Sequence, residues 1–173
     1  MYLRIFILLL LLVIFAEDWK SRAVHWVLFP MLCLSLLALQ YAEHRLTIAM
    51  GAIALMNAGF VLAQLLLVTL YFSIKNRHLT RITDGLIGWG DILFLFSITV
   101  FFSLLNFLAF YLLSLVLILL GWTCIRLLVN TQDKAIPLAG LQALLFTGLL
   151  SCDWWLKDLS LASDMHLLNF IIR

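Results

Sequence analysis

Residues 92–123 read ILFLFSITVFFSLLNFLAFYLLSLVLILLGWT and contain no charged side chain. This stretch is much longer than the about 20 apolar residues that one membrane-crossing helix needs. It therefore predicts two helices joined by a turn, which Ser103 and Asn106 mark best. The sequence indicates an all-α, polytopic membrane protein.

Composition supports the same class. Of the 173 residues, 65% are hydrophobic and 12% are charged, whereas soluble domains average roughly 45–50% apolar and about 25% charged residues. A net charge of +2 is too small to indicate a nucleic-acid partner. The three cysteines form no CxxC pair and no Cys/His cluster with zinc spacing, so we expect neither a metal site nor a structural disulfide.

Apolar runs along the whole chain predict about six transmembrane helices. Arg4 and the apolar run after it resemble a signal peptide, but no small-residue cleavage site follows, so we expect an uncleaved first helix. The transmembrane domain should cover residues 1–157, and residues 158–173 should form an interfacial or disordered tail. The expected helices cover about 2–16, 24–42, 47–74, 90–103, 106–128 and 136–156.

Lysine and arginine set the expected orientation, because cytoplasmic loops carry an excess of both residues. Seven of them lie at or after the ends of the first, third and fifth predicted helices, against four on the opposite side. We therefore expect both termini outside the cytoplasm. The seven are Lys20, Arg22, Lys75, Arg77, Arg81, Arg126 and Lys134, and the four are Arg4, Arg45, Lys157 and Arg173.

Two carboxylates lie at the ends of apolar runs on the predicted cytoplasmic side. Gly88-Trp89-Gly90-Asp91 opens the fourth predicted helix, and Asp18 follows the first. An ionisable group in such a place indicates a functional site by default, although Asp91 would also suit a helix cap. Glu17 competes with Asp18, but it points about 100° away on a helix. Paired acids suggest aspartic-protease chemistry, which needs no cofactor.

Three local patterns together resemble the type IV prepilin peptidases, which are GxGD-type aspartic proteases of the bacterial inner membrane. Asp18 is followed six residues later by Val24, Gly88-Trp89-Gly90-Asp91 matches GxGD, and Ile136-Pro137-Leu138-Ala139-Gly140-Leu141 is similar to the segment that begins the family's last helix. The resemblance covers about residues 16–143. The cysteine-containing insertion of the larger members is absent, so the chain looks like the short, peptidase-only form.

The resemblance implies that Asp18 and Asp91 are catalytic and that Gly88, Gly90 and Pro137 support them. Lys20 and Arg22 are included with these supporting residues. The implied partners are the lipid bilayer and a prepilin-like or pseudopilin-like protein, whose basic leader is cut at the cytoplasmic face. The chain departs from the family pattern at His25-Trp26, where Pro-Asn is usual, and at Leu93, where Lys is usual.

Two other classes compete with this interpretation. One is a non-catalytic polytopic protein, such as a degenerate homologue, a channel or an assembly component of a pilus or secretion system. Charges inside several helices or inverted repeats would favour transport, and the sequence shows neither. The other is a presenilin-like GxGD protease, which would need more helices and a Tyr-Asp first motif where this chain has Glu17-Asp18.

Overall fold

The computed structural model describes residues 1–45, 47–76, 88–129 and 136–156, and within these ranges it contains six α-helices and no strand. The all-α class predicted from the sequence is confirmed. The predicted tail at 158–173 lies outside the described residues. The helices are α1 (Tyr2–Ser21), α2 (Leu28–Ala42), α3 (Ile48–Asn76), α4 (Trp89–Ile98), α5 (Leu104–Val129) and α6 (Leu138–Leu156).

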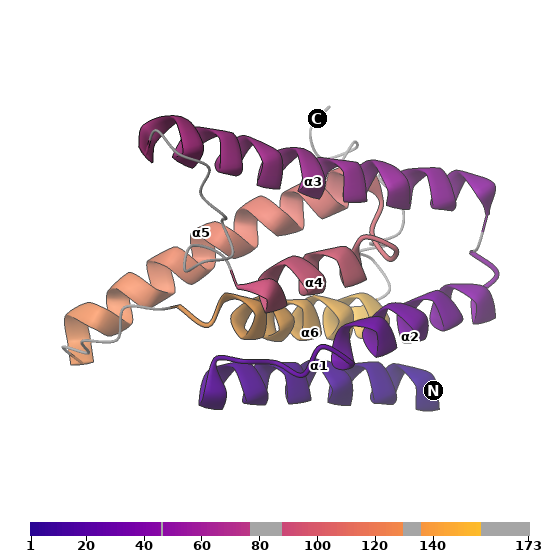
Figure 1. Ribbon diagram of the computed structural model, residues 1–173. Coiled ribbons are helices and arrows are strands. Elements are labelled where there is room, and N and C mark those ends of the chain that lie inside the picture. Colours follow the sequence, from indigo (N-terminus) through magenta and orange to yellow (C-terminus); the bar gives the residue numbers. More distant parts are fainter. Residues whose placement is uncertain (46, 77–87, 130–135, 157–173) are drawn as a thin grey trace, which may run out of the picture.

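Successive helices run in opposite directions along the long dimension of the molecule (Figure 1). The end of α1 and the starts of α4 and α6 therefore lie on one side, towards the left of that view. The opposite side is held by ionic contacts. Arg4 near the start of α1 pairs with Glu43 after α2 at 2.7 Å, and its guanidinium lies 5.3 Å from the centre of the Trp154 ring of α6.

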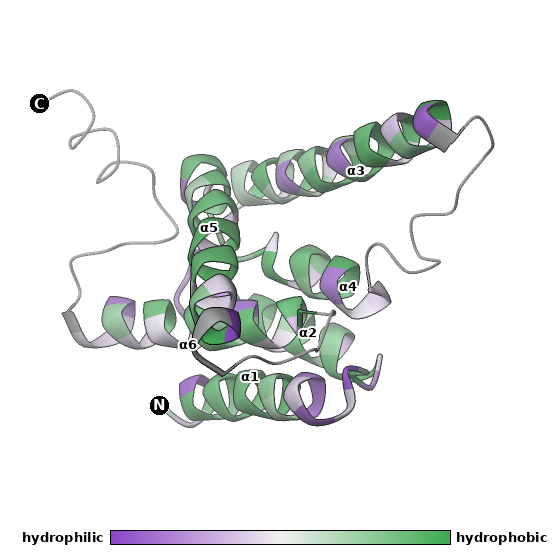
Figure 2. Cartoon of the chain, turned by 90° about the vertical axis from the view of Figure 1, so that its left-hand side faces the viewer, coloured by the Kyte–Doolittle hydropathy of each residue, from purple (hydrophilic) through white to green (hydrophobic). Residues whose placement is uncertain are grey.

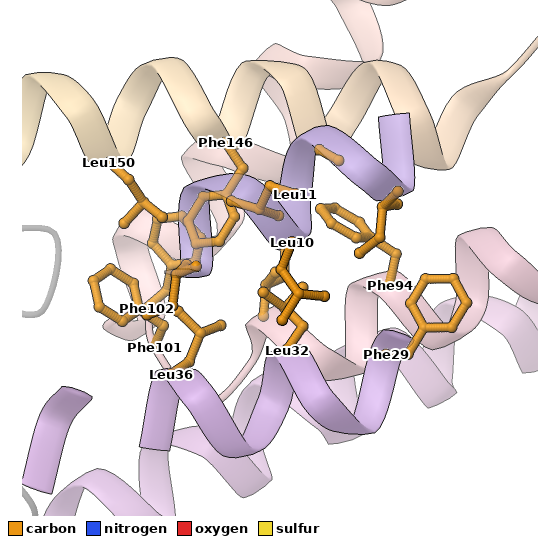
Figure 3. Packing of buried hydrophobic residues seen from close by; sticks show 14 of the residues in the cluster. Leu10, Leu11, Phe29, Leu32, Leu36, Phe94, Phe101, Phe102, Phe146 and Leu150 are labelled. Carbon is orange, nitrogen blue, oxygen red and sulfur yellow. The ribbon is translucent and has the colours of Figure 1, made fainter. Parts of the chain in front are cut away.

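The core lies between α1, α2, α4 and α6 (Figure 3). α1 packs most extensively on α6, and α4 contacts α2, α3 and α6. Large apolar side chains from these helices and from the turn after α4 fill the space between them, and their close packing contributes dispersion energy to the folded state. The labelled core residues are Leu10, Leu11, Phe29, Leu32, Leu36, Phe94, Phe101, Phe102, Phe146 and Leu150.

Two buried amide side chains explain where the long apolar stretch turns. α4 ends at Ile98, earlier than the predicted boundary near 103, because the carbonyl groups that follow accept hydrogen bonds from side chains of α2 and α3. Buried carbonyl groups need such partners. Gln40 donates to the carbonyls of Val100 (2.8 Å) and Phe101 (3.2 Å), and Asn57 donates to those of Thr99 (3.2 Å) and Phe102 (3.1 Å).

The described helices differ in whether they are long and apolar enough to cross a membrane. Among the helices that the structure describes, only α3 and α5 are long and apolar enough to cross a bilayer, with mean hydropathy of 2.1 and 2.5. Most residues along both helices have the colour of hydrophobic residues in Figure 2. The prediction of about six transmembrane helices is thus supported only in part. α4, with 10 residues, spans about 15 Å at the helical rise, half the about 30 Å of a bilayer core.

Candidate active site

Asp18 continues the buried stripe of α1. Ile7, Leu11, Ile14 and Asp18 are spaced by three or four residues and all face the protein interior. α1 extends beyond the predicted boundary at 16 and ends at Ser21, so the helix itself carries the carboxylate into the contact with α6. Asp18 is only 7% exposed. This side chain therefore occupies a core position although it is ionisable.

Asp91 lies in the first turn of α4. Gly88, in extended conformation (φ −70°, ψ 142°), precedes the helix, and its N–H donates to Asp91 Oδ2 at 3.3 Å. The carboxylate thus satisfies one of the amides that a helix start leaves without a partner. Asp91 Oδ1 accepts a second hydrogen bond, 2.7 Å long, from the backbone N–H of Ala139 in α6. Asp91 caps α4 and also contacts α6.

The start of α6 brings the two acids together. Leu141 N–H donates to the carbonyl of Pro137 as the helix begins, and the two amides before it point out of the first turn. Ala139 N–H donates to Asp91 Oδ1, and Gly140 N–H donates to Asp18 Oδ2 at 2.6 Å. A helix N-terminus offers unpaired N–H groups and a partial positive charge, both of which favour carboxylates. Two consecutive amides therefore hold the two predicted catalytic acids.

The absence of a side chain at Gly140 lets Asp18 of α1 lie close to the backbone of α6. A Cβ atom on Gly140 would lie 2.9 Å from Asp18 Cβ and 3.2 Å from the carbonyl oxygen of Phe15, closer than ordinary contacts allow. The predicted glycines are less constrained. A Cβ on Gly88 would lie 3.2 Å from Asp91 Oδ2, and one on Gly90 would lie no closer than 3.7 Å to Phe29. Gly88 and Gly90 were predicted from the sequence as residues that support the acids, but Gly140 was not. The only sequence signal for Gly140 was its position three residues after Pro137.

Burial and hydrogen bonding act on the two acids in opposite directions. Both acids lie at helix ends and outside α3 and α5, the two helices that are long and apolar enough to cross a membrane. Burial raises the pKa of Asp18, and the Gly140 amide and the Arg22 charge lower it in part. The pKa of Asp91 rises to about 6, mainly through burial and further through the charge of Asp18, against the hydrogen bond from Ala139. The acids are therefore electrostatically coupled, and the protonated form of Asp91 is available near neutral pH.

Glu17 is separated from this pair. Its Oε2 accepts a hydrogen bond from the His25 backbone N–H, and its Oε1 lies 3.0 Å from His25 Nδ1. The backbone hydrogen bond from His25 is the main reason that the pKa of Glu17 is lowered. Because His25 is bound to Glu17 of α1, α2 begins at Leu28 and not at the predicted boundary near 24. Asp18, and not Glu17, is therefore the acid that accepts a hydrogen bond from the α6 amide next to the one that Asp91 uses.

The remaining predicted residues surround the acids in different ways. Arg22 has a left-handed conformation (φ 52°), and its N–H donates to the Asp18 carbonyl, which ends α1. Lys20 is exposed, and Trp26 is 70% exposed. Leu93, at the position where the resembling family has Lys, packs against the hydrophobic core.

The chemistry that the site offers is that of two coupled carboxylates. No group of three or more His, Cys, Asp or Glu side chains gathers to bind a metal in the parts of the chain that the structure describes. No protein-family model matches the sequence, and no curated protein or solved structure is significantly similar to the chain.

Proposed function

We propose that this protein is a membrane aspartic endopeptidase that cleaves prepilin-like substrates behind a basic leader. The observation that carries the proposal is the pair of carboxylates, Asp18 and Asp91, held on consecutive amides at the start of α6. The resemblance of the sequence around Asp18, Asp91 and Pro137 to type IV prepilin peptidases supplies the substrate class.

The mechanism follows from the sharing of one proton. Two neighbouring carboxyl groups do not readily ionise together, so one is ionised and the other protonated. The ionised group takes a proton from a water molecule as its oxygen attacks the scissile carbonyl. The protonated group donates a hydrogen bond to that carbonyl oxygen, and a proton from the pair then passes to the leaving amine as the C–N bond breaks.

The hydrogen bonds to Ala139 and Gly140 keep this pair in place during the reaction. They are charge-assisted when the accepting carboxylate is ionised, and such bonds are shorter and stronger than neutral ones. They also limit the rise in pKa that burial causes. The start of α6 therefore positions both acids and helps one of them to remain ionised.

The proposed setting is the bacterial inner membrane. The helical bundle lies in the bilayer, with both termini outside the cytoplasm and the two carboxylates at the cytoplasmic boundary. The excess of Lys and Arg on that side supports this orientation. The exposed apolar surfaces of α3 and α5 support a lipid environment (Figure 2).

The proposal is tested with purified protein in lipid vesicles and a synthetic peptide that joins a basic leader to an apolar helix. Asp18→Asn and Asp91→Asn should each lower the cleavage rate by at least about 10³-fold, because Asn cannot exchange the proton. Glu17→Gln is the matched control and should stay within about threefold of the wild type, since its partner is an exposed His25. Comparable cleavage by the wild type and both Asn variants would contradict the mechanism.

A further inference from the structure

A cavity of about 120 Å³ lies between α3, α4 and α5 and reaches the start of α6. Asp91 and Ile92 of α4 form one wall, Val68 of α3 and Leu115 of α5 lie around it, and Leu138 lies at the α6 end. One of the two proposed catalytic acids is thus part of the wall of an apolar cavity. Another cavity, of about 150 Å³ between α5 and α6, has Trp19 and Trp122 in its lining but neither acid.

The size of the cavity next to Asp91 indicates what it can hold. A protein cavity of about 150 Å³ with an apolar lining accommodates benzene. A cavity of about 120 Å³ therefore has room for one large aliphatic or aromatic side chain. Since Asp91 is on its wall, a side chain bound there would belong to a residue very near the bond being cut.

Two polar side chains also line this otherwise apolar space. Gln64 of α3 and Tyr111 of α5 both line the cavity, and the Gln64 side chain hydrogen-bonds to the Tyr111 side chain. Tyr111 is fixed further by edge-to-face contact with Phe60, at 5.9 Å between ring centres. A carboxamide has two N–H donors and a carbonyl acceptor, which is more than one hydrogen bond to Tyr111 uses. Gln64 can therefore also pair with a main-chain amide group beside the cavity.

We infer that this cavity is the specificity pocket for one large apolar side chain adjacent to the scissile bond, and that Gln64, held by Tyr111, positions the substrate main chain. The inference rests on the proposed function. It assigns α3, whose surface is mostly exposed, as one wall of the substrate site.

The test is photo-cross-linking, which does not depend on cleavage. The probe is the basic-leader peptide with photo-leucine at either residue flanking the leader boundary, added to protein in lipid vesicles. Mass spectrometry should locate the adducts on cavity residues such as Val61, Val68 and Leu115. Val68→Phe should lower labelling at least about fivefold because the ring fills the cavity. Leu67→Phe, on the exposed face of the same helix turn, should change labelling less than about twofold.

The role of Gln64 is tested by the apparent Kd for labelling. Gln64→Leu and Tyr111→Phe should each raise this Kd about 3- to 10-fold, the value of one lost hydrogen bond. Tyr71→Phe is the matched control, since Tyr71 is 60% exposed. Adducts spread over the exposed face of α3, or labelling unchanged by Val68→Phe, would overturn the inference even if the wild type cleaves. Labelling in the cavity without cleavage would support the pocket and contradict the peptidase proposal.

Discussion

Asp18 and Asp91, from helices far apart in the sequence, accept hydrogen bonds from the adjacent amides of Gly140 and Ala139. One helix N-terminus therefore sets the relative position of both acids. The acids in turn provide partners for amides that α6 would otherwise leave unpaired. This relationship makes the start of α6 as important to the site as the acids are.

Gly140→Ala should therefore disrupt the site although no functional group is removed. The new Cβ would lie 2.9 Å from Asp18 Cβ, and overpacking of this kind costs about 1–3 kcal/mol. We expect a lower unfolding temperature and strongly reduced peptide cleavage. Gly148→Ala in the same helix is the control, because no atom lies within 4 Å of its Cβ position, and helix propensity should make it neutral or stabilising by up to about 1 kcal/mol. Equal unfolding temperatures and cleavage rates for the two variants would show that the close contact between Gly140 and Asp18 is unimportant.

Raising the pH should destabilise the folded protein through Asp91. The pKa of Asp91 is about 6 in the folded state against an ordinary value of 3.8, so the folded state holds its proton more tightly than the unfolded state. The contribution of Asp91 to the free energy of unfolding is greatest below about pH 4 and is lost as pH rises through about 6. The loss is at most about 1.4 kcal/mol for each pH unit in that window. Thermal unfolding measured from pH 4 to 7 should show this slope. Asp91→Asn should remove most of it, and an unchanged slope would refute the assignment.

Gln40→Leu should destabilise the α4–α5 turn by about 1–2 kcal/mol, because two buried carbonyl groups lose their partner. Asn57→Leu should cost less, although Asn57 also donates to two carbonyls. The reason is that Asn57 Oδ1 is buried without a hydrogen-bond partner, and leucine removes that cost. Thermal unfolding in detergent measures both. Thr123→Val, at an exposed hydroxyl, should have little effect, and a larger loss for Asn57→Leu than for Gln40→Leu would contradict this explanation.

Reporter fusions test the proposed orientation. Fusions after Arg81 and Lys134 should report a cytoplasmic position, and fusions after Arg45 and Arg173 should report the opposite side, because of the distribution of Lys and Arg. A cytoplasmic C-terminus would contradict the proposed topology, because either the number of membrane crossings would be odd or the N-terminus would also be cytoplasmic.

The sequence predicts the helices better than the contacts between them. Hydropathy locates all six, and the boundary errors have local causes that periodicity does not register, such as the Glu17–His25 contact before α2 and the Gln40 side chain after α4. Gly140 was missed because its role depends on its closeness to Asp18, a residue 122 positions away in the chain. The sequence shows Gly140 only as part of the segment 136–141, and that local pattern does not indicate a contact with Asp18.

The central claim is that Asp18 and Asp91 act as one catalytic unit, and a double-mutant cycle on peptide cleavage tests it most directly. Cleavage rates would be measured for wild type, Asp18→Asn, Asp91→Asn and the double Asn variant in the same lipid vesicles. Residues that act as a unit are strongly non-additive, so the double variant should cleave no more slowly than either single variant. A fold-loss in rate for the double variant equal to the product of the two single losses would contradict this claim. Wild-type rates in either single variant would also contradict it.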